Sequence, residues 1–244
     1  GGTAAAMILA HRGYEVTVIE KNDRVWGRNA ELKVGDFSFD TGPTFLHTPW
    51  LIQQVFDAAG EKIEDHLDLT QLAPFNTIVY QDKTIQCHTD PDLMYEEIRT
   101  KFPGNEKKFH TYLKQEKELN EALFPCLLKD YQHWWQLLRP ALLKAAPKVF
   151  SRHSVYSKLG KFFPDEQLRM CMSFQTKYLG MTPWKCPGFL SILSSWEYLY
   201  GVYHIEWWLC RLSQSMAKIA QKNGAHVRLN SEVETCILDN KQIT

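Results

Sequence analysis

Residues 1–21, GGTAAAMILAHRGYEVTVIEK, decide the fold. Two glycines open this stretch, an alanine-rich segment over residues 3–12 ends at Gly13, and a short apolar run then ends at an acidic residue, Glu20. The order is typical of a dinucleotide-binding βαβ unit, in which glycines let a pyrophosphate approach a helix N-terminus and the acidic residue accepts hydrogen bonds from a ribose. The pattern therefore predicts a nucleotide cofactor with Gly1 and Gly2 near its phosphates and Glu20 on its ribose.

The composition narrows the class of partner. Lys and Arg together number 28, as do Asp and Glu, so no net charge attracts nucleic acid, and we expect a small-molecule partner. The six cysteines form no C-x-x-C pair and the nine histidines no H-x-x-x-H pair. We therefore predict neither a metal site nor a disulfide framework, and a reduced, cytoplasmic compartment. No uncharged run of about 18 apolar residues occurs, and no signal peptide is recognised.

Local patterns predict a mixed α/β chain. Gly35-Asp36 between two alternating runs predicts a β-hairpin over 31–34 and 37–40. The other predicted elements are a helix over 49–59, a hairpin over 78–80 and 84–87, proline-punctuated helices after Asp90, a helix over 209–219, and strands over 226–229 and 232–238. Both ends are expected to be truncated, with a first strand missing before residue 1 and a further strand starting at 241–244 after a turn at Asp239-Asn240.

Three separated segments resemble one family. Residues 20–28, EKNDRVWGR, resemble the E-K-x-x-x-x-G-G-R segment of flavin-dependent amine-oxidase-like proteins, and residues 39–44, FDTGPT, resemble the F-D-x-G-P-T signature of bacterial carotenoid desaturases. Residues 174–180, 201–203 and 229–233 follow in the family's order. Over nearly its whole length the chain is similar to the phytoene and diapophytoene (dehydrosqualene) desaturases of the FAD-dependent amine oxidase superfamily.

The resemblance implies an FAD-binding, Rossmann-like, doubly wound α/β domain, formed by residues 1–90 and 222–244. A mainly helical lobe for substrate and membrane, residues 91–221, would interrupt it. Arg28 suits a phosphate-proximal loop, Gly42 and Pro43 would bring backbone close to the isoalloxazine, and Val233 would offer main-chain hydrogen bonds to the adenine. The cofactor-binding residues implied are Gly1, Gly2, Glu20, Lys21, Gly27, Arg28, Gly42, Pro43, Thr44 and Val233.

The implied activity is FAD-dependent desaturation of a carotenoid precursor, in which two hydrogens leave a saturated carbon pair of a long isoprenoid. Nothing in the spacing of Asp130, Glu166 and Glu197 singles out a catalytic acid or base, so the sequence identifies no catalytic residue. The alternatives are a related carotenoid oxygenase, isomerase or retinol-saturase-like flavoenzyme, and a catalytically silent fragment. The sequence leaves open the chain length of the substrate and the oligomeric state.

A basic segment between Pro140 and Pro164 predicts contact with a membrane. It contains no acidic residue; its cations are Lys144, Lys148, Arg152, Lys158 and Lys161, and its apolar residues include Leu142, Leu143, Val149, Phe150, Leu159, Phe162 and Phe163. Such a segment either rests in the headgroup layer, as a peripheral membrane protein would, or forms a solvated helical face. Trp134-Trp135 and residues 198–203 either line a hydrocarbon tunnel or belong to the core.

Three tryptophans depart from the family pattern. Trp26, Trp207 and Trp208 stand where the family would carry glycine. An indole where backbone must approach a phosphate or flavin would collide with the ligand or displace the loop, which predicts weakened flavin binding. One hypothesis is that the three codons are sequence errors or recent lesions, which resequencing the source DNA would test.

Overall fold

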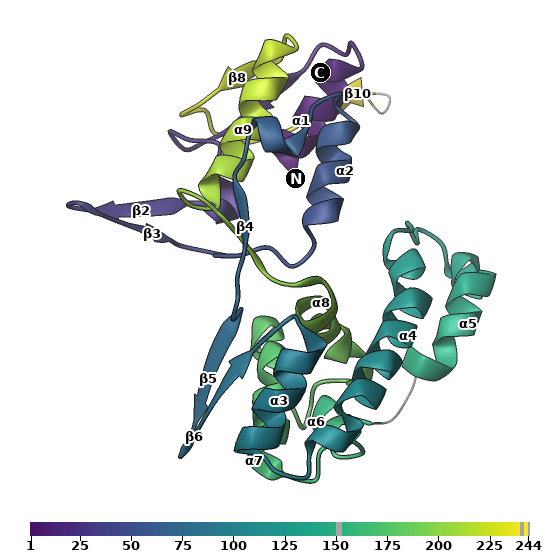
Figure 1. The fold of residues 1–244 in the computed structure, drawn as a ribbon. Helices are drawn as coiled ribbons and strands as arrows, with labels where there is room; N and C mark the ends of the chain where they lie inside the picture. The colour runs from purple at the N-terminus through teal and green to yellow at the C-terminus, as the bar shows by residue number, and fades with distance from the viewer. Residues whose placement is uncertain (150–152, 240–241, 244) are drawn as a thin grey trace. The chain divides into compact units, whose positions relative to one another are not determined.

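The computed structural model describes residues 1–149, 153–239 and 242–243, which have mixed α/β content (Figure 1). The chain forms two compact units: unit 1 contains residues 1–71 and 203–244, and unit 2 contains residues 72–202. These boundaries differ from those predicted at residues 90 and 222. The hairpin over 76–87 belongs to unit 2 because it packs on that unit's helices, and the helix over 210–222 belongs to unit 1 because it packs on the first helix.

Unit 1 is built around two helices and one parallel strand pair. Helix α1 (Gly2–His11) packs on α9 (Cys210–Lys222), and β1 (Thr17–Ile19) pairs in parallel with β8 (His226–Arg228). The α1–α9 contact is close because α1 buries the small side chains Ala6 and Ala10. Helix α2 (Pro49–Asp57) adds Phe56 to the same core. A wider doubly wound sheet is not present among the described residues, where β1 and β8 form the only parallel pair.

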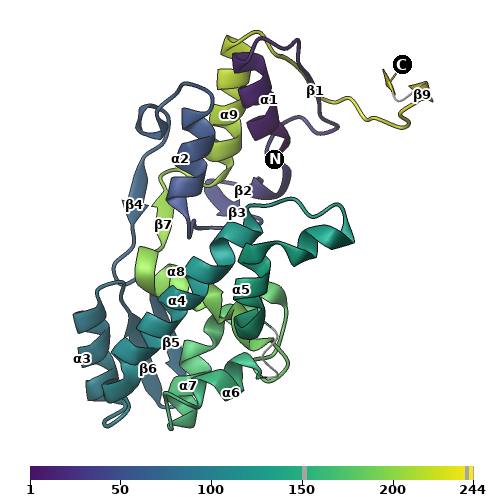
Figure 2. The ribbon, with the colours of Figure 1, turned by 90° about the vertical axis from the view of Figure 1, so that its right-hand side faces the viewer.

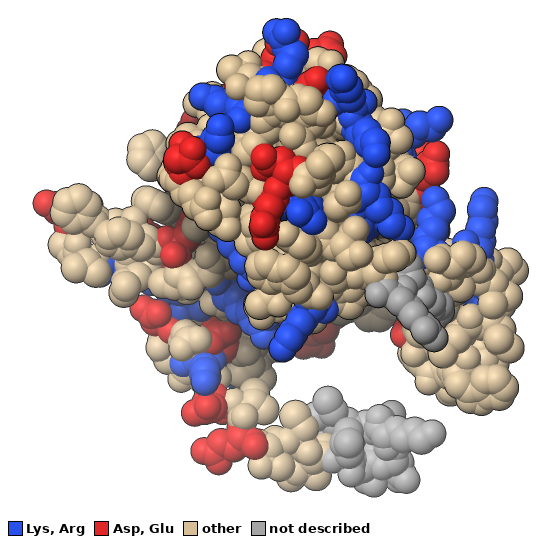
Figure 3. All heavy atoms as spheres, turned by 90° about the horizontal axis from the view of Figure 1, so that it is seen from below, with Lys and Arg blue, Asp and Glu red and all other residues tan. Residues whose placement is uncertain are grey.

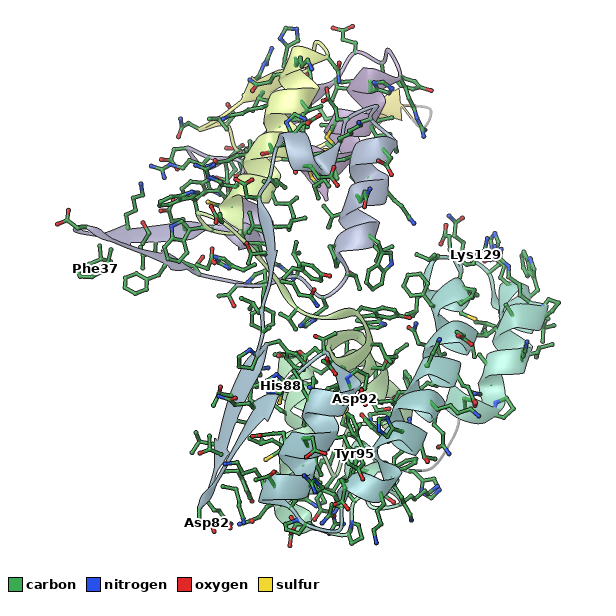
Figure 4. The ribbon with its side chains drawn as sticks, in the orientation of Figure 1. Phe37, Asp82, His88, Asp92, Tyr95 and Lys129 are labelled. Carbon is green, nitrogen blue, oxygen red and sulfur yellow. The ribbon has the colours of Figure 1, made fainter. Side chains whose placement is uncertain are left out.

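Antiparallel pairs complete unit 1. Strands β2 (Glu31–Val34) and β3 (Phe37–Asp40) form the predicted hairpin, whose turn Gly35 has φ +60°. Figure 4 labels Phe37 beside the turn of this hairpin. Strand β4 (Leu69–Gln71) pairs with β7 (Tyr203–Ile205) after the short 3-10 helix η2 (Ile63–Asp65), and β9 (Leu238–Asp239) pairs with β10 (Gln242–Ile243). The predicted strand over 232–238 is wrong for 232–237, which pair with no described strand.

Unit 2 combines one hairpin with a helical cluster. The hairpin is β5 (Asn76–Tyr80) with β6 (Lys83–Cys87). The helices are α3 (Pro91–Lys101), η3 (Glu106–Lys108), α4 (Phe109–Leu127), η4 (Trp134–Leu138), α5 (Pro140–Val149), α6 (Val155–Leu159), α7 (Glu166–Met172), η5 (Phe174–Leu179), η6 (Gly188–Ser191) and α8 (Ile192–Tyr200). In the core, the Tyr112 ring meets Phe162 and Phe163 edge-on at 5.5 and 5.4 Å. None of the described helices has the length and apolar character needed to cross a bilayer.

The second half of the predicted membrane segment contributes its apolar side chains to this core. Leu159, Phe162 and Phe163 are buried, so these three side chains are not available to a bilayer, whereas Ser157 and Lys161 are exposed. Lys158 is mostly buried as well, because its ammonium pairs with Glu116 on α4, a carboxylate with no solvent exposure. Phe150 and Arg152 lie outside the described residues.

The Glu116–Lys158 pair is completed by a hydroxyl. Ser191 Oγ donates to Glu116 Oε2 at 2.8 Å and accepts from Lys158 Nζ at 2.7 Å. A buried ion pair is stable only when further hydrogen bonds satisfy its polar atoms, and Ser191 supplies one. The pair therefore joins α4, α6 and η6 at one point of the unit 2 core.

Candidate functional site

A cavity of about 350 Å³ lies at the N-terminus of α1 in unit 1. Its lining residues are Gly1, Gly2, Thr3, Val18, Ile19, Glu20, Val25, Trp26, Gly27, Arg28, Asn29 and Ser213. No side chain caps α1, so its first-turn N–H groups remain available to an anion. A Cβ built at Gly1, Gly2 or Gly27 would meet no atom within 4 Å, so each of these glycines borders open space. A pyrophosphate fits this helix end.

Glu20 is held at the cavity with one oxygen available. It follows β1 directly, and its backbone N–H donates to the Arg228 carbonyl at 2.9 Å. Glu20 Oε1 accepts from the backbone N–H of Asn22 at 2.9 Å and from its side-chain amide at 2.7 Å. Oε2 accepts no hydrogen bond from the described part of the chain, so it can receive a ribose hydroxyl, as predicted for the acidic residue of a dinucleotide site.

The 3-10 turn η1 (Gly27–Asn29) forms another wall of the cavity. Gly27 has φ +56°, a left-handed conformation that glycine adopts without strain. Asn29 Nδ2 donates to Ser213 Oγ on α9 at 3.2 Å, which ties the turn to the helix. The exposed Arg28 forms no ion pair with any described carboxylate, so its guanidinium remains available to a phosphate.

Gly42 supports Arg28 through the backbone. A Cβ built at Gly42 would collide with the Arg28 carbonyl oxygen, and Thr41 donates from both its N–H and its hydroxyl to the Ala30 carbonyl at 2.9 Å. The sequence predicts glycine here for approach to an isoalloxazine. Contact with the chain's own carbonyl already requires glycine at this position, whether or not a ligand is bound.

We expect Gly42→Ala to lower the free energy of unfolding by about 1–3 kcal/mol, because a methyl group must displace backbone. It should also weaken flavin binding, because the loop that moves carries Arg28. Thermal denaturation and flavin titration measure the two effects. Asp36→Ala, in the exposed turn of the same hairpin, is the control; equal stability of the two variants would contradict the supporting role of Gly42.

Five predicted cofactor residues do not line this cavity: Gly42, described above, and four others. Lys21 points to Glu232, with its Nζ 3.9 Å from a carboxylate oxygen and both side chains exposed. Pro43 and Thr44 are exposed in the loop after Gly42, where the Thr44 carbonyl lies 3.3 Å from His204 Nδ1. Val233 is exposed in the segment that forms no strand, so the structure does not place its main chain at the cavity.

The three tryptophans that replace family glycines line one larger cavity. This cavity, of about 690 Å³, is lined by Arg24, Trp26, Glu31, Lys33, Asp36, Ser38, His204, Trp207, Trp208, Cys210, Arg211 and Gln214. Trp207 and Trp208 have φ of +64° and +84°, a region in which a residue with a Cβ is strained. The backbone therefore has a glycine-like conformation at both positions, as the family pattern implies.

The start of α9 adjoins this cavity. Asp40 Oδ1 accepts from the Leu209 N–H at 3.3 Å, just after the two tryptophans. Burial raises the pKa of the Asp40 carboxyl, and the Leu209 hydrogen bond opposes that shift. The last residue of β3 thus holds the N-terminus of α9 next to the strained Trp207-Trp208 pair.

The sequence did not identify Thr3, Asn29 and Ser213 as cavity residues. Asn29 directly follows the recognised Gly27-Arg28 pair, so its place in the motif was an available signal. Ser213 lies 184 positions from its partner Asn29, and no local pattern distinguishes it from other helical serines.

The three carboxylates considered as catalytic groups occupy different environments in unit 2. Glu197 is buried and accepts from Gln175 Nε2 at 2.6 Å and from the Tyr178 hydroxyl at 3.0 Å. Burial and the Glu197 charge both raise the pKa of Tyr178. Asp130 and Glu166 accept hydrogen bonds from Gln132 and Tyr156. The geometry assigns none of them to catalysis, and no described cluster of His, Cys, Asp and Glu could hold a metal ion.

Comparison with known proteins defines the class. The family of flavin-containing amine oxidoreductases matches residues 1–241, and the chain belongs to this family. FAD is accordingly its cofactor, and the cavity at α1 fits the nucleotide part of FAD. An oxidoreductase from Methanosarcina mazei shares the fold with a TM-score of 0.57 at 14% identity, over 99% of this chain and 54% of that structure.

The relatives at higher identity are carotenoid desaturases. The chain is 35% identical over 240 residues to a 4,4'-diapophytoene desaturase (4,4'-diapolycopene-forming) of Methylomonas sp, covering 98% of this chain and 47% of that protein. It is 30% identical over 241 residues to a zeta-carotene-forming phytoene desaturase of Myxococcus xanthus, with coverage of 98% and 47%. The chain thus spans about half the length of the curated relatives it matches.

Proposed function

We propose that this chain is the FAD-nucleotide-binding part of an oxidoreductase that desaturates a carotenoid precursor, phytoene or diapophytoene. The main support is the α1 cavity, which brings Gly1, Gly2, Glu20 and the Gly27-Arg28 turn to one opening in a chain related to such desaturases. FAD, when bound, supplies the two-electron oxidation that removes two hydrogens from a carbon pair.

The residues of unit 1 have separate roles in this proposal. The first-turn N–H groups of α1 and the guanidinium of Arg28 would hold the pyrophosphate, and Glu20 Oε2 would accept from the ribose. Gly42 and Thr41 keep the Arg28 turn in position through their backbone contacts. Lys21, Pro43, Thr44 and Val233 remain proposed cofactor contacts on the strength of the family motifs alone.

Unit 2 is proposed to hold the polyene and to contact a membrane. The family motifs and the carotenoid desaturases related to this chain support an apolar isoprenoid substrate, and such a substrate partitions into a bilayer. The protein would then work at the cytoplasmic membrane surface. The aromatic residues suggested for a tunnel differ in exposure: Trp134 and Trp135 are exposed, whereas Tyr198 is buried beside Phe75 and Phe109.

Expression in a host that accumulates diapophytoene or phytoene tests this function. The experiment should use the full-length gene, because the chain spans about half the length of the curated relatives it matches. Coloured polyenes with more conjugated double bonds are the expected products. A soluble, flavin-loaded protein that leaves both precursors unchanged would reject desaturation, and oxygenated or isomerised products would support the related activities instead.

Glu20→Ala is expected to weaken FAD binding by about 10- to 100-fold, because a hydrogen bond to a carboxylate contributes about 1.5–3 kcal/mol. Quenching of flavin fluorescence on titration with the protein measures the dissociation constant. Glu15→Ala, in the connection from α1 to β1 and outside the cavity, is the control. Equal affinity of the two variants would exclude Glu20 from the ribose site.

A further inference from the structure

The connection between α4 and α5 exposes several large apolar side chains in unit 2, separated by polar residues. We call residues 127–143 the α4–α5 tip. Seven of its large apolar side chains are between 51% and 72% exposed: Leu127, Leu128, Trp134, Trp135, Leu137, Leu138 and Leu143. Single exposed leucines are common on soluble proteins, but clusters of this kind mark sites of contact with another phase or partner.

The tip has defined local structure. The His133 ring stacks on Trp135 at 4.3 Å, and Trp134 meets Trp135 edge-on at 6.1 Å. The His133 N–H donates to Gln136 Oε1 at 2.9 Å, and Arg139 Nη1 donates to the Asp130 carbonyl at 3.2 Å. The indoles are therefore exposed by an ordered turn and are positioned before any partner arrives.

The tip rests on a packed base. Ala145 of α5 is fully buried against α4, in a cluster with Leu119, Leu123, Cys126 and Ile192. Helices α4 and α5 thus hold both ends of the tip, and Figure 2 shows η4 extending from the paired helices. Leu142 of the tip packs against this cluster, whereas the seven exposed apolar side chains are not part of it.

Cations surround the apolar surface. Residues 127–149 carry Lys129, Arg139, Lys144 and Lys148 against one carboxylate, Asp130; Figure 4 labels Lys129 at the end of α4. From α4, Glu118 lies 3.7 Å from Lys148, which leaves the other three cations without a salt bridge to a described residue. In Figure 3, the right-hand lobe that contains α5 is mainly tan, with blue side chains along its edge.

The combination of exposed leucines, exposed indoles and nearby cations suits the interface of an anionic bilayer. Leucine side chains enter the outer acyl region, indoles are favoured at headgroup depth, and each nearby Lys or Arg is attracted to anionic lipid. A second copy of the chain fits less well, because a symmetric contact would bring the same cations together. The charge on the tip therefore favours lipid as the partner.

We propose that the α4–α5 tip is the membrane-insertion surface of the protein and binds anionic phospholipid. The biological reason rests on the proposed function, since a polyene substrate would be drawn from a bilayer. The tip overlaps the 140–164 segment only at residues 140–143, and the apolar side chains farther along that segment, Leu159, Phe162 and Phe163, are buried.

Vesicle flotation with the 244-residue chain tests the proposal without substrate or flavin. We expect binding to vesicles of mixed phosphatidylglycerol and phosphatidylcholine, and much weaker binding to phosphatidylcholine alone. Trp134→Ser with Trp135→Ser should weaken binding about tenfold or more. Lys129→Gln with Lys144→Gln should lower binding to the anionic vesicles only. Phe37→Ser with Phe39→Ser removes exposed apolar surface from β3 and is the matched control, expected to bind normally.

Brominated lipids provide a second readout. They should quench tryptophan fluorescence of the unaltered chain strongly and that of the Trp134/Trp135 double variant much less. Circular dichroism should show unchanged folding, because the altered side chains are exposed. Absence of vesicle binding, or binding that the tip substitutions leave unchanged, would overturn the proposal. So would a concentration-dependent dimer that the same substitutions abolish, since the tip would then be an interface between copies.

Discussion

Lys158→Met is expected to lower the free energy of unfolding by about 3–5 kcal/mol, because it leaves the Glu116 carboxylate buried without its cation. Glu116 has no solvent exposure, and among the described residues Ser191 would be the remaining donor to it. For a chain of this size the loss corresponds to a fall in melting temperature of about 10 °C or more. Thermal and urea denaturation measure it.

Two controls separate loss of the ion pair from loss of a lysine side chain. Lys161→Met removes a nearby exposed lysine and should change stability by less than about 0.5 kcal/mol. Glu116→Leu combined with Lys158→Met replaces the pair by apolar side chains and should recover most of the stability. A double variant no more stable than Lys158→Met would show that the pair has a role beyond charge compensation.

Trp207→Gly combined with Trp208→Gly is expected to raise the free energy of unfolding by about 1–2 kcal/mol. Both residues have positive φ, where a side chain costs about 1–2 kcal/mol each, while added backbone freedom in the unfolded chain offsets about half of the gain. The melting temperature should rise by about 2–8 °C. Most substitutions that remove a large aromatic side chain are destabilising, so an increase in stability would be distinctive of relieved backbone strain.

Trp184→Gly is the control for this pair. Trp184 is also exposed, but its φ is not positive and its ring lies 5.0 Å from that of Tyr156, so its loss should destabilise unit 2. Removal of the two indoles from the larger cavity should also tighten FAD binding, measured by titration. Lower stability of the Trp207/Trp208 double variant would show that contacts of the two indoles outweigh the backbone strain.

The sequence predicted best the elements whose signals are local. The hairpin over 31–34 and 37–40 has the predicted bounds because a two-residue turn fixes strand register. Helix α9 ends near Gly224, whose φ of +94° suits the predicted stop. The apolar residues after Ser231 predicted a strand that the structure lacks, because a strand needs a neighbouring strand to pair with, and a local pattern does not show whether one is present.

Errors arose where distant residues decide the environment. Residues 155–163 have the composition of a surface segment, but Lys158 pairs with Glu116 from another helix and the neighbouring aromatics enter the core. At the candidate site, five of the predicted cofactor residues, Gly1, Gly2, Glu20, Gly27 and Arg28, border one cavity, and their role in cofactor binding stays a prediction. Ser213 was missed because its role depends on how α9 packs beside η1.

The contacts of Thr41 and Gly42 with residues 28–30 close the base of the β2–β3 hairpin. The residues between Ala30 and Thr41 therefore form a loop whose two ends are joined by these contacts. The length of this loop can change without shifting the position of Arg28, because the contacts at the base of the hairpin lie between the loop and the nucleotide cavity. A longer Gly35-Asp36 turn, for example one that carries a peptide tag, should therefore leave Arg28 in place.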